Sequence, residues 1–240
     1  MYSDADAAAL YDVLNPWGPS DDFYLSYVMA ATSVLDVGCG TGMLLHRARE
    51  SGHKGRLCGL DPDVAALDRA RSRGDIEWVE GKAEDAQWDG EFELAFMASN
   101  AFQVFVTDDE LRVSLSAIRR ALVDGGLFAF GTRNPLVREW EEWEAADPDD
   151  VVDHEGRALR VSYDVEAVNG DVVALAEATS TPSGEVLRVD RACLRFLGVK
   201  QLQAFLAQAR FAVEHVYGDW SKGPFSETSR NIVVVARAVE

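Results

Sequence analysis

The residues from Asp36 to Gly42 are the part of this chain whose types and spacing are best suited to chemistry. They read Asp-Val-Gly-Cys-Gly-Thr-Gly, follow the apolar run Ser33–Val37 and precede a stretch of helical periodicity. Glycines have no Cβ, so the backbone can turn tightly and approach a ligand closely. The helix that follows directs unpaired N–H groups and a partial positive charge at the same place. This order of strand, glycine turn and helix predicts a site for a ligand that carries a nucleoside.

The spacing of the glycines narrows the choice of ligand. A nicotinamide-binding turn has the pattern Gly-x-Gly-x-x-Gly, which would put its third glycine at Met43 rather than at Gly42. The carboxylate of Asp36 stands just before the first glycine, where it would repel a pyrophosphate and attract an ammonium group. S-adenosylmethionine carries an ammonium and a carboxylate at its amino acid end and suits such a turn. A nicotinamide-dependent oxidoreductase is the alternative that the spacing disfavours.

Residues 34–42, VLDVGCGTG, closely resemble the first motif of class I S-adenosylmethionine-dependent methyltransferases. The resemblance extends in arrangement over residues 11–130 and 199–238, and it implies S-adenosyl-L-methionine as the cofactor. Family members often carry an aspartate near the adenine amino group, directly after the glycine that follows the third strand. This chain has Lys82 there, and lysine cannot accept a hydrogen bond from that amino group.

The fold class expected from the hydrophobic pattern is α/β. Apolar runs at 33–37, 55–60, 76–80, 92–97 and 127–132 alternate with helical patterns at 43–51, 64–73 and 108–122. Such alternation predicts a parallel sheet with helices on both faces. Residues 211–217 and 232–238 follow a helix expected at 199–209, and no long crossover helix lies between them. We expect them to pair as a C-terminal antiparallel hairpin, which completes a Rossmann-like, seven-stranded, mostly parallel sheet.

Residues 136–197 interrupt this core, which we expect to comprise residues 1–135 and 198–240. Runs at 159–168, 172–179 and 186–197 alternate apolar and polar residues, and Asn169-Gly170 and Ser183-Gly184 separate them. This pattern predicts an antiparallel three-stranded insertion that serves as a substrate cap or as the interface of a homodimer. Its arrangement resembles that of small-molecule methyltransferases, including those that act on amino sugars and other natural products.

The predicted cofactor contacts lie at the carboxyl ends of the strands, where open α/β sheets bind their ligands. Asp61 is expected to bind the ribose hydroxyls, with a helix cap before Pro62 as the alternative. The resemblance implies that residues 1–30 form a lid over the cofactor; the alternative is a pair of helices that merely pack on the sheet. The predicted cofactor-binding residues are Tyr11, Trp17 and Tyr24 in this segment, Asp36, Gly38, Cys39, Gly40 and Gly42 at the turn, Asp61 and Pro62 after the second strand, Ala83 and Glu84 after the third, and Met97 and Phe102 around the end of the fourth.

The predicted acceptor-binding residues follow the later strands and the insertion. They are Ser99 and Asn100 after the fourth strand, Arg133 and Asn134 after the fifth, and the aromatic residues Trp140, Tyr217 and Trp220. Aromatic rings can wall an apolar pocket and attract a sulfonium by cation–π contact, although ordinary packing is the alternative for each of them. His154 is nominated as a general base, because imidazole titrates near neutral pH.

The composition of the chain indicates which classes of partner it can bind. The formal net charge of −18 repels phosphate groups, so nucleic acid and anionic membrane surfaces are not expected as partners. Three irregularly spaced cysteines predict neither a disulfide framework nor a metal cage. The acidic N-terminus lacks the pattern of a signal peptide, which favours a cytoplasmic location. We therefore expect a methyltransferase acting on N or O of a small molecule; the alternatives are the oxidoreductase and a non-catalytic protein that binds S-adenosylmethionine.

Overall fold

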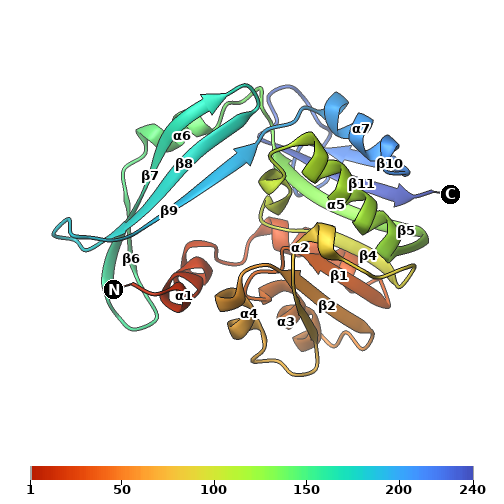
Figure 1. Ribbon diagram of the computed structural model, residues 1–240, viewed down its shortest axis with the longest axis horizontal. Coiled ribbons are helices and arrows are strands. Elements are labelled where there is room, and N and C mark those ends of the chain that lie inside the picture. Colours follow the sequence, from red (N-terminus) through yellow and green to blue (C-terminus); the bar gives the residue numbers. More distant parts are fainter. Residues whose placement is uncertain (1, 240) are drawn as a thin grey trace.

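The computed structural model describes residues 2–239 and, within them, all side chains except those of residues 144 and 145. Two sheets organise this part of the chain: a seven-stranded sheet in the core and a four-stranded sheet in the insertion (Figure 1). None of the helices found between residues 2 and 239 has the length and apolar character required to cross a membrane.

The core sheet has the order β10-β11-β5-β4-β1-β2-β3. Its strands are β1 (Ser33–Val37), β2 (Arg56–Asp61), β3 (Glu77–Glu80), β4 (Phe92–Met97), β5 (Leu122–Arg133), β10 (Phe211–Tyr217) and β11 (Asn231–Ala238). β1 to β5 pair in parallel, whereas β11 runs antiparallel to both β5 and β10. The predicted mostly parallel sheet with a C-terminal hairpin is confirmed. The strand order reverses at β1 and β4, where open sheets of this kind form their ligand crevice.

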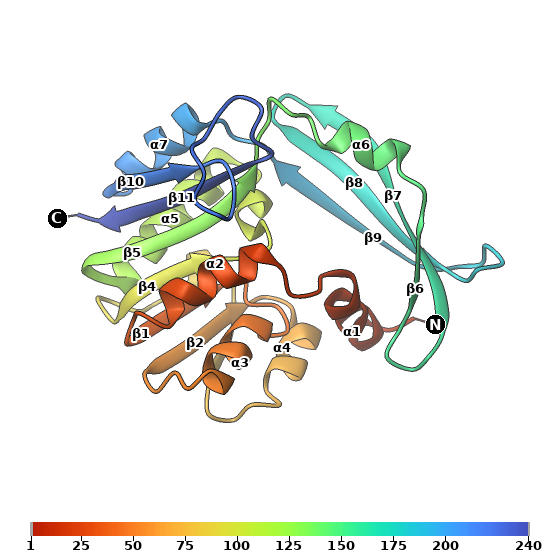
Figure 2. The same ribbon diagram turned by 180° about the vertical axis from the view of Figure 1, so that it is seen from behind.

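Helices cover both faces of this sheet, as predicted. α5 (Asp108–Ala121) and α7 (Val199–Gln208) pack on one face, and α2 (Pro19–Val28) and α3 (Met43–Glu50) pack on the other (Figures 1 and 2). α5 buries Leu111, Leu115 and Ile118 at helical spacing, and Thr107 and Glu110 form a capping box at its start. The remaining elements of the core are α1 (Asp4–Leu14), α4 (Val64–Ala70) and the short 3₁₀ helices η1 (Ala83–Asp85) and η2 (Ala101–Val104).

The insertion contains α6 (Trp140–Ala145) and the antiparallel strands β6 (Asp149–Val152), β7 (Ala158–Asn169), β8 (Val172–Ser180) and β9 (Val186–Arg195). β7, β8 and β9 confirm three predicted strands, but the prediction of a three-stranded sheet is wrong because β6 adds a fourth. β6 reads Asp-Asp-Val-Val, which is too short and too acidic to show a period of two. It is held at the edge by pairing with β7, where Arg160 Nε donates to Asp150 Oδ1 at 2.9 Å.

Helix α1 connects the insertion with the core. Its Leu10 packs with Leu159 and Val161 of β7, while its Asp12 accepts a hydrogen bond from Thr41 Oγ1 at 2.5 Å next to the glycine turn. Figures 1 and 2 show α1 lying between the insertion sheet and α4. α2 takes a different place, because its Phe23 and Tyr24 are buried in the core beside the sheet.

Candidate active site

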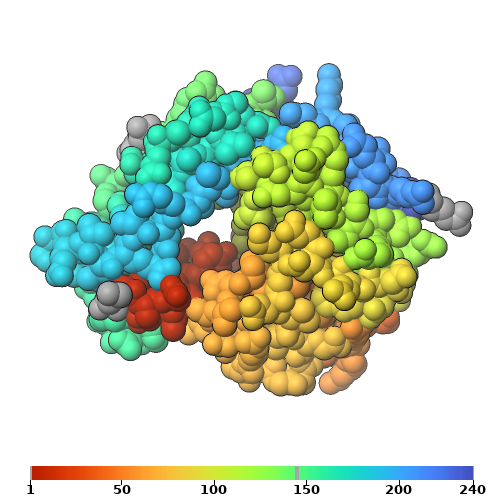
Figure 3. Space-filling model, viewed as in Figure 1, coloured from red at the N-terminus to blue at the C-terminus, as the bar shows by residue number. Residues whose placement is uncertain are grey.

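A cavity of about 750 Å³ lies between the carboxyl ends of the core strands and the inner face of the insertion sheet. Helix α1 forms one side of it, and Figure 3 shows the opening between the insertion, α1 and the core. Its volume falls within the range of about 300–1,000 Å³ that small-molecule sites occupy. The glycine turn therefore faces a cavity whose opposite wall belongs to the insertion.

The glycine turn joins β1 to α3 with backbone angles that side chains disfavour. Gly42 has φ +77°, and a Cβ there would overlap the ring of Trp78. Gly38 has φ +79°, and a Cβ there would lie 3.1 Å from the Cβ of Ala101. Both positions therefore favour glycine, and Gly38, which lines the cavity, leaves bare backbone on this wall.

Asp61 fastens the turn to the end of β2. Its Oδ2 accepts a hydrogen bond from the Gly40 N–H at 2.7 Å, and its Oδ1 accepts one from the Asp63 N–H at 2.8 Å. The cap of α4 is Asp63 rather than Asp61, because Asp63 Oδ1 accepts from the first free N–H groups of that helix. Each Asp61 oxygen accepts only one of these bonds and keeps a second lone pair, and Asp61 lines the cavity, so it remains compatible with ribose hydroxyls.

Asp36 is a deeply buried carboxylate of the core. Only 2% of the residue is exposed, and Oδ1 has no hydrogen-bond partner among the residues that the structure describes. Burial raises the pKa of Asp36 well above its usual range, and the charges of Asp61 and Asp21 raise it further. Buried polar atoms are nearly always hydrogen-bonded. A buried, unpartnered carboxylate beside a cavity therefore fits a ligand that brings its own N–H donors, as the ammonium group of S-adenosylmethionine does.

The inner face of the insertion supplies polar side chains to the opposite wall. Tyr163, Glu177 and Asp190 stand in one row across β7, β8 and β9, because Tyr163 pairs with Glu177 and Glu177 with Asp190. Thr179 and Arg188 form the neighbouring pair, and all five side chains line the cavity. Sequence reasoning missed these residues. The strands carry polar residues on both faces, so alternation alone does not distinguish the face toward the cavity.

The ends of β4 and β5 complete the site. Ser99 and Asn100 line the cavity with φ of 50° and 57°, which are uncommon for residues other than glycine and occur often at functional sites. Arg133 lies deeper, where its Nη1 donates to Gln103 Oε1 at 2.8 Å and its Nε is 3.4 Å from Glu139 Oε1.

The structure brings many of the predicted site residues together around this cavity. Those that line it are Tyr11, Asp36, Gly38, Cys39, Gly40, Asp61, Ser99, Asn100 and Arg133. They come from α1 and from the ends of β1, β2, β4 and β5, as the rule for open sheets predicts.

The other predicted site residues lie outside the lining of the cavity, and some of them pack in the core. Phe102 stacks on Phe130 with ring centroids 3.9 Å apart, and Trp140 packs edge-on against Phe196. The other residues outside the cavity lining are Trp17 and Tyr24 on or before α2, Gly42 at the start of α3, Pro62 after β2, Ala83 and Glu84 in η1, Met97 in the core, Asn134 beside the loop before β11, and Tyr217 and Trp220 against α2.

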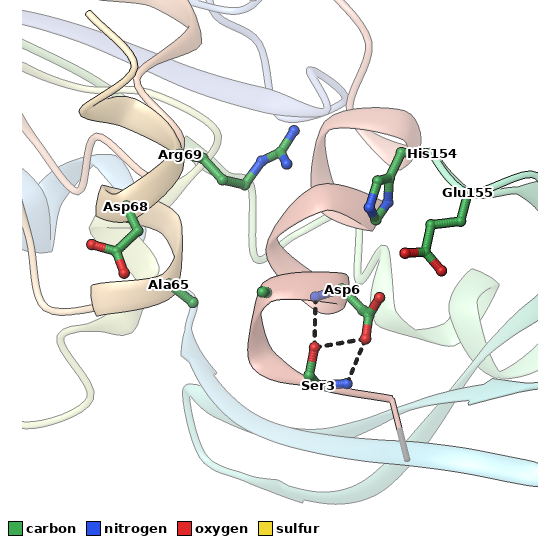
Figure 4. Close-up of a pocket in the computed structure, with 8 residues that line it drawn as sticks. Ser3, Asp6, Ala65, Asp68, Arg69, His154 and Glu155 are labelled. Atoms are coloured by element: carbon green, nitrogen blue, oxygen red, sulfur yellow. Dashed lines mark hydrogen bonds between the residues drawn. The ribbon is translucent and has the colours of Figure 1, made fainter.

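His154 lies away from the glycine turn. It is exposed in the turn between β6 and β7, in a groove of about 550 Å³ lined also by Asp6, Glu155 and Arg69. Figure 4 shows these side chains around the start of α1 and on α4. The linings of this groove and of the cavity have no residue in common within the described part of the chain. The assignment of His154 as a base stays a prediction to which this geometry adds no support.

Similarity to known proteins distinguishes between the possible ligands of the glycine turn. Residues 34–126 match the family model described as a methyltransferase domain. This chain is a class I S-adenosylmethionine-dependent methyltransferase. Among curated proteins, the methyltransferase is 27% identical to the cypemycin N-terminal methyltransferase of a Streptomyces species, over 85% of this chain and 82% of that protein.

Solved structures share the fold of this methyltransferase. One is an S-adenosylmethionine-dependent methyltransferase from Clostridium acetobutylicum, with a TM-score of 0.77, 15% identity and 98% of each chain covered. Another is CalS10 with S-adenosylmethionine bound, an amino pentose methyltransferase from Micromonospora echinaspora involved in calicheamicin biosynthesis. Its TM-score is 0.71 at 20% identity, with 100% of this chain and 98% of that chain covered. S-adenosylmethionine is thus the cofactor, and the orphaned Asp36 oxygen and the glycine turn fit it.

Proposed function

We propose that this methyltransferase transfers the methyl group to the nitrogen of a small, amine-bearing acceptor that binds between the core and the insertion. The charge of the cavity carries the proposal. Seven carboxyl side chains line it, Asp12, Asp21, Asp36, Asp61, Asp63, Glu177 and Asp190, against two guanidinium groups, Arg133 and Arg188. A cavity with an excess of negative charge concentrates cations. Amines are cations near neutral pH, whereas hydroxyl and phenol acceptors are not.

Two of the proteins similar to this chain support the choice of nitrogen. The curated relative is named for methylation at the N-terminus of cypemycin, and CalS10 is described as an amino pentose methyltransferase. Both names point to acceptors that carry an amine.

The residues of this chain would act mainly by placement. When bound, S-adenosylmethionine would supply a methyl group on a sulfonium sulfur. The acceptor ammonium would first lose its proton to solvent, and the uncharged nitrogen could then take the methyl group and leave S-adenosylhomocysteine. Asp36 would hold the ammonium of its amino acid end, and Asp61 the ribose. Ser99 and Asn100 would border the reacting groups, and the insertion would close over the acceptor. Holding reactants in line and excluding water supply most of the catalysis that such a transfer needs.

The test is calorimetric titration with S-adenosylhomocysteine, followed by incubation with S-adenosylmethionine and matched acceptors. The pairs are glucosamine with N-acetylglucosamine, and the tripeptide Ala-Ala-Ala with its N-acetylated form. We expect mass spectrometry to find N-methylated product from a free amine and none from its acetylated counterpart. Methylation confined to hydroxyl groups, or methylation of both members of a pair at equal rates, would refute the proposal.

A further inference from the structure

Most carboxylates of the cavity already have partners within the protein. Asp12 is bonded to Thr41 and Arg69, and Asp21 accepts from the Gly18 N–H. Asp61 and Asp63 accept from backbone N–H groups of the turn and of α4, and Asp190 holds Arg188 through two contacts of 2.5 and 2.7 Å. These five groups each accept a hydrogen bond or form an ion pair within the protein.

Two carboxylates remain without such a partner. One is Asp36, at the cofactor end of the cavity. The other is Glu177, in the middle strand of the insertion wall. No arginine, lysine or backbone N–H group within residues 2–239 forms an ion pair or hydrogen bond with Glu177; only the phenol of Tyr163 is close enough to share a hydrogen bond. The cavity therefore holds two unpaired acidic positions, one at each end.

The cations nearest to Glu177 are committed elsewhere. Arg188 of β9 is bonded to Asp190 and reaches Asp4 of α1 at 2.6 Å. Arg133 of β5 lies against Glu139 and Gln103. Glu177 therefore faces the cavity with a tyrosine on one side and an already neutralised carboxylate on the other. A partly buried carboxylate left in this state is stabilised by a cation that arrives from the cavity.

We infer that Glu177 selects the acceptor by binding its ammonium group, with Tyr163 orienting the carboxylate from the neighbouring strand. The inference rests on the proposed function and names the residue that would recognise the substrate. The acceptor class is a primary or secondary amine carried by a small molecule. An amino sugar and the N-terminus of a peptide share this chemistry, and the experiment separates them.

The test compares Glu177→Gln with wild type, using protein loaded with S-adenosylhomocysteine. Glutamine keeps the size of the side chain and removes its charge. The matched control is Glu166→Gln, which removes a charge from β7 where Glu166 pairs with Arg191 outside the cavity. Saturation-transfer NMR would measure the binding of glucosamine and of Ala-Ala-Ala, each beside its N-acetylated form. Glu177→Asp serves as the conservative variant.

We expect Glu177→Gln to weaken the binding of the free amine roughly 10- to 100-fold, as loss of a charge-assisted hydrogen bond does. The affinity for S-adenosylhomocysteine should stay within about twofold, which shows that the variant is folded. Glu177→Asp should recover part of the binding, and Glu166→Gln should match wild type. Preference for glucosamine would identify a sugar acceptor, and preference for Ala-Ala-Ala a peptide.

Equal amine binding by wild type and Glu177→Gln would overturn the inference, and so would a wild-type protein that binds neither amine better than its acetylated form. The two proposals fail separately. N-methyl transfer with full activity in Glu177→Gln would leave the proposed function standing and remove the role of Glu177. Transfer to oxygen alone would remove the proposed function itself.

Discussion

The substitution Asp36→Asn tests whether this buried carboxylate is reserved for the cofactor. In the free protein, Asp36 is 2% exposed and its Oδ1 lacks a hydrogen-bond partner within the described residues. Burial of an uncompensated charge opposes folding, so a neutral amide of the same shape should raise the free energy of unfolding by about 1–3 kcal/mol. The bound cofactor, in contrast, would lose a charge-assisted hydrogen bond of about 1.5–3 kcal/mol, which is a loss of affinity of roughly 10- to 150-fold.

Urea denaturation of the free protein at pH 7.5 would measure the first effect, and calorimetric titration with S-adenosylhomocysteine the second. Asp164→Asn, an exposed change on the insertion outside the cavity lining, is the matched control and should alter neither quantity. Opposite signs for stability and affinity are the signature of a binding carboxylate. If Asp36→Asn destabilises the free protein, or if the affinity stays unchanged, then Asp36 is a structural residue and the assignment is wrong.

Four further substitutions or conditions follow from the site. Burial raises the pKa of Asp36, so its contribution to the stability of the free protein is present at low pH and is lost as the pH rises. When an ammonium group binds, the Asp36 carboxyl gives up its proton. The affinity for S-adenosylhomocysteine should therefore increase from about pH 5 to pH 7. In Asp36→Asn this dependence, which Asp61, Asp21 and Tyr24 also influence, should flatten. Gly42→Ala should lower the free energy of unfolding by about 2–4 kcal/mol in urea, against about 1–2 for Gly40→Ala, because only the former adds overlap with Trp78 to the backbone strain. Asp12→Ala should speed the dissociation of S-adenosylhomocysteine by up to about fivefold in stopped flow, since α1 loses its bonds to Thr41 and Arg69; an unchanged rate would show that α1 does not control access. His154→Ala should keep kcat within about twofold, whereas loss of a general base would lower it by about 10²–10⁴.

The sequence predicts which of the proposed cofactor residues lie together, because those residues are local. Asp36, the glycine turn and Asp61 lie at the ends of consecutive strands whose hydrophobic runs are plain, and parallel pairing brings those ends together. Lys82 shows the limit of this reasoning, since a departure from the family pattern does not say which group contacts adenine instead.

The insertion wall, which we assign to the acceptor, is harder to predict, because it depends on contacts that no short pattern records. Tyr163, Glu177 and Asp190 meet only through the register of three antiparallel strands. Which face of that sheet turns toward the core is decided by packing at its two ends, where Leu159 meets α1 and Phe196 meets α6. The aromatic residues illustrate the same limit, since Trp140 and Phe102 are suited equally to a pocket and to a core, and the structure buries both.

The insertion leaves the core once, after β5, and rejoins it once, before α7. One continuous segment of the chain thus forms most of the wall opposite the glycine turn. Asp36 and Asp61 belong to strands that precede this segment in the sequence. Under the proposed function, changes within this segment would alter the acceptor side of the cavity while Asp36 and Asp61 stay in place. Laboratory chimeras that exchange residues 136–197 between homologous enzymes would exploit the same modularity, and α1 would have to travel with the exchanged piece because it packs on β7.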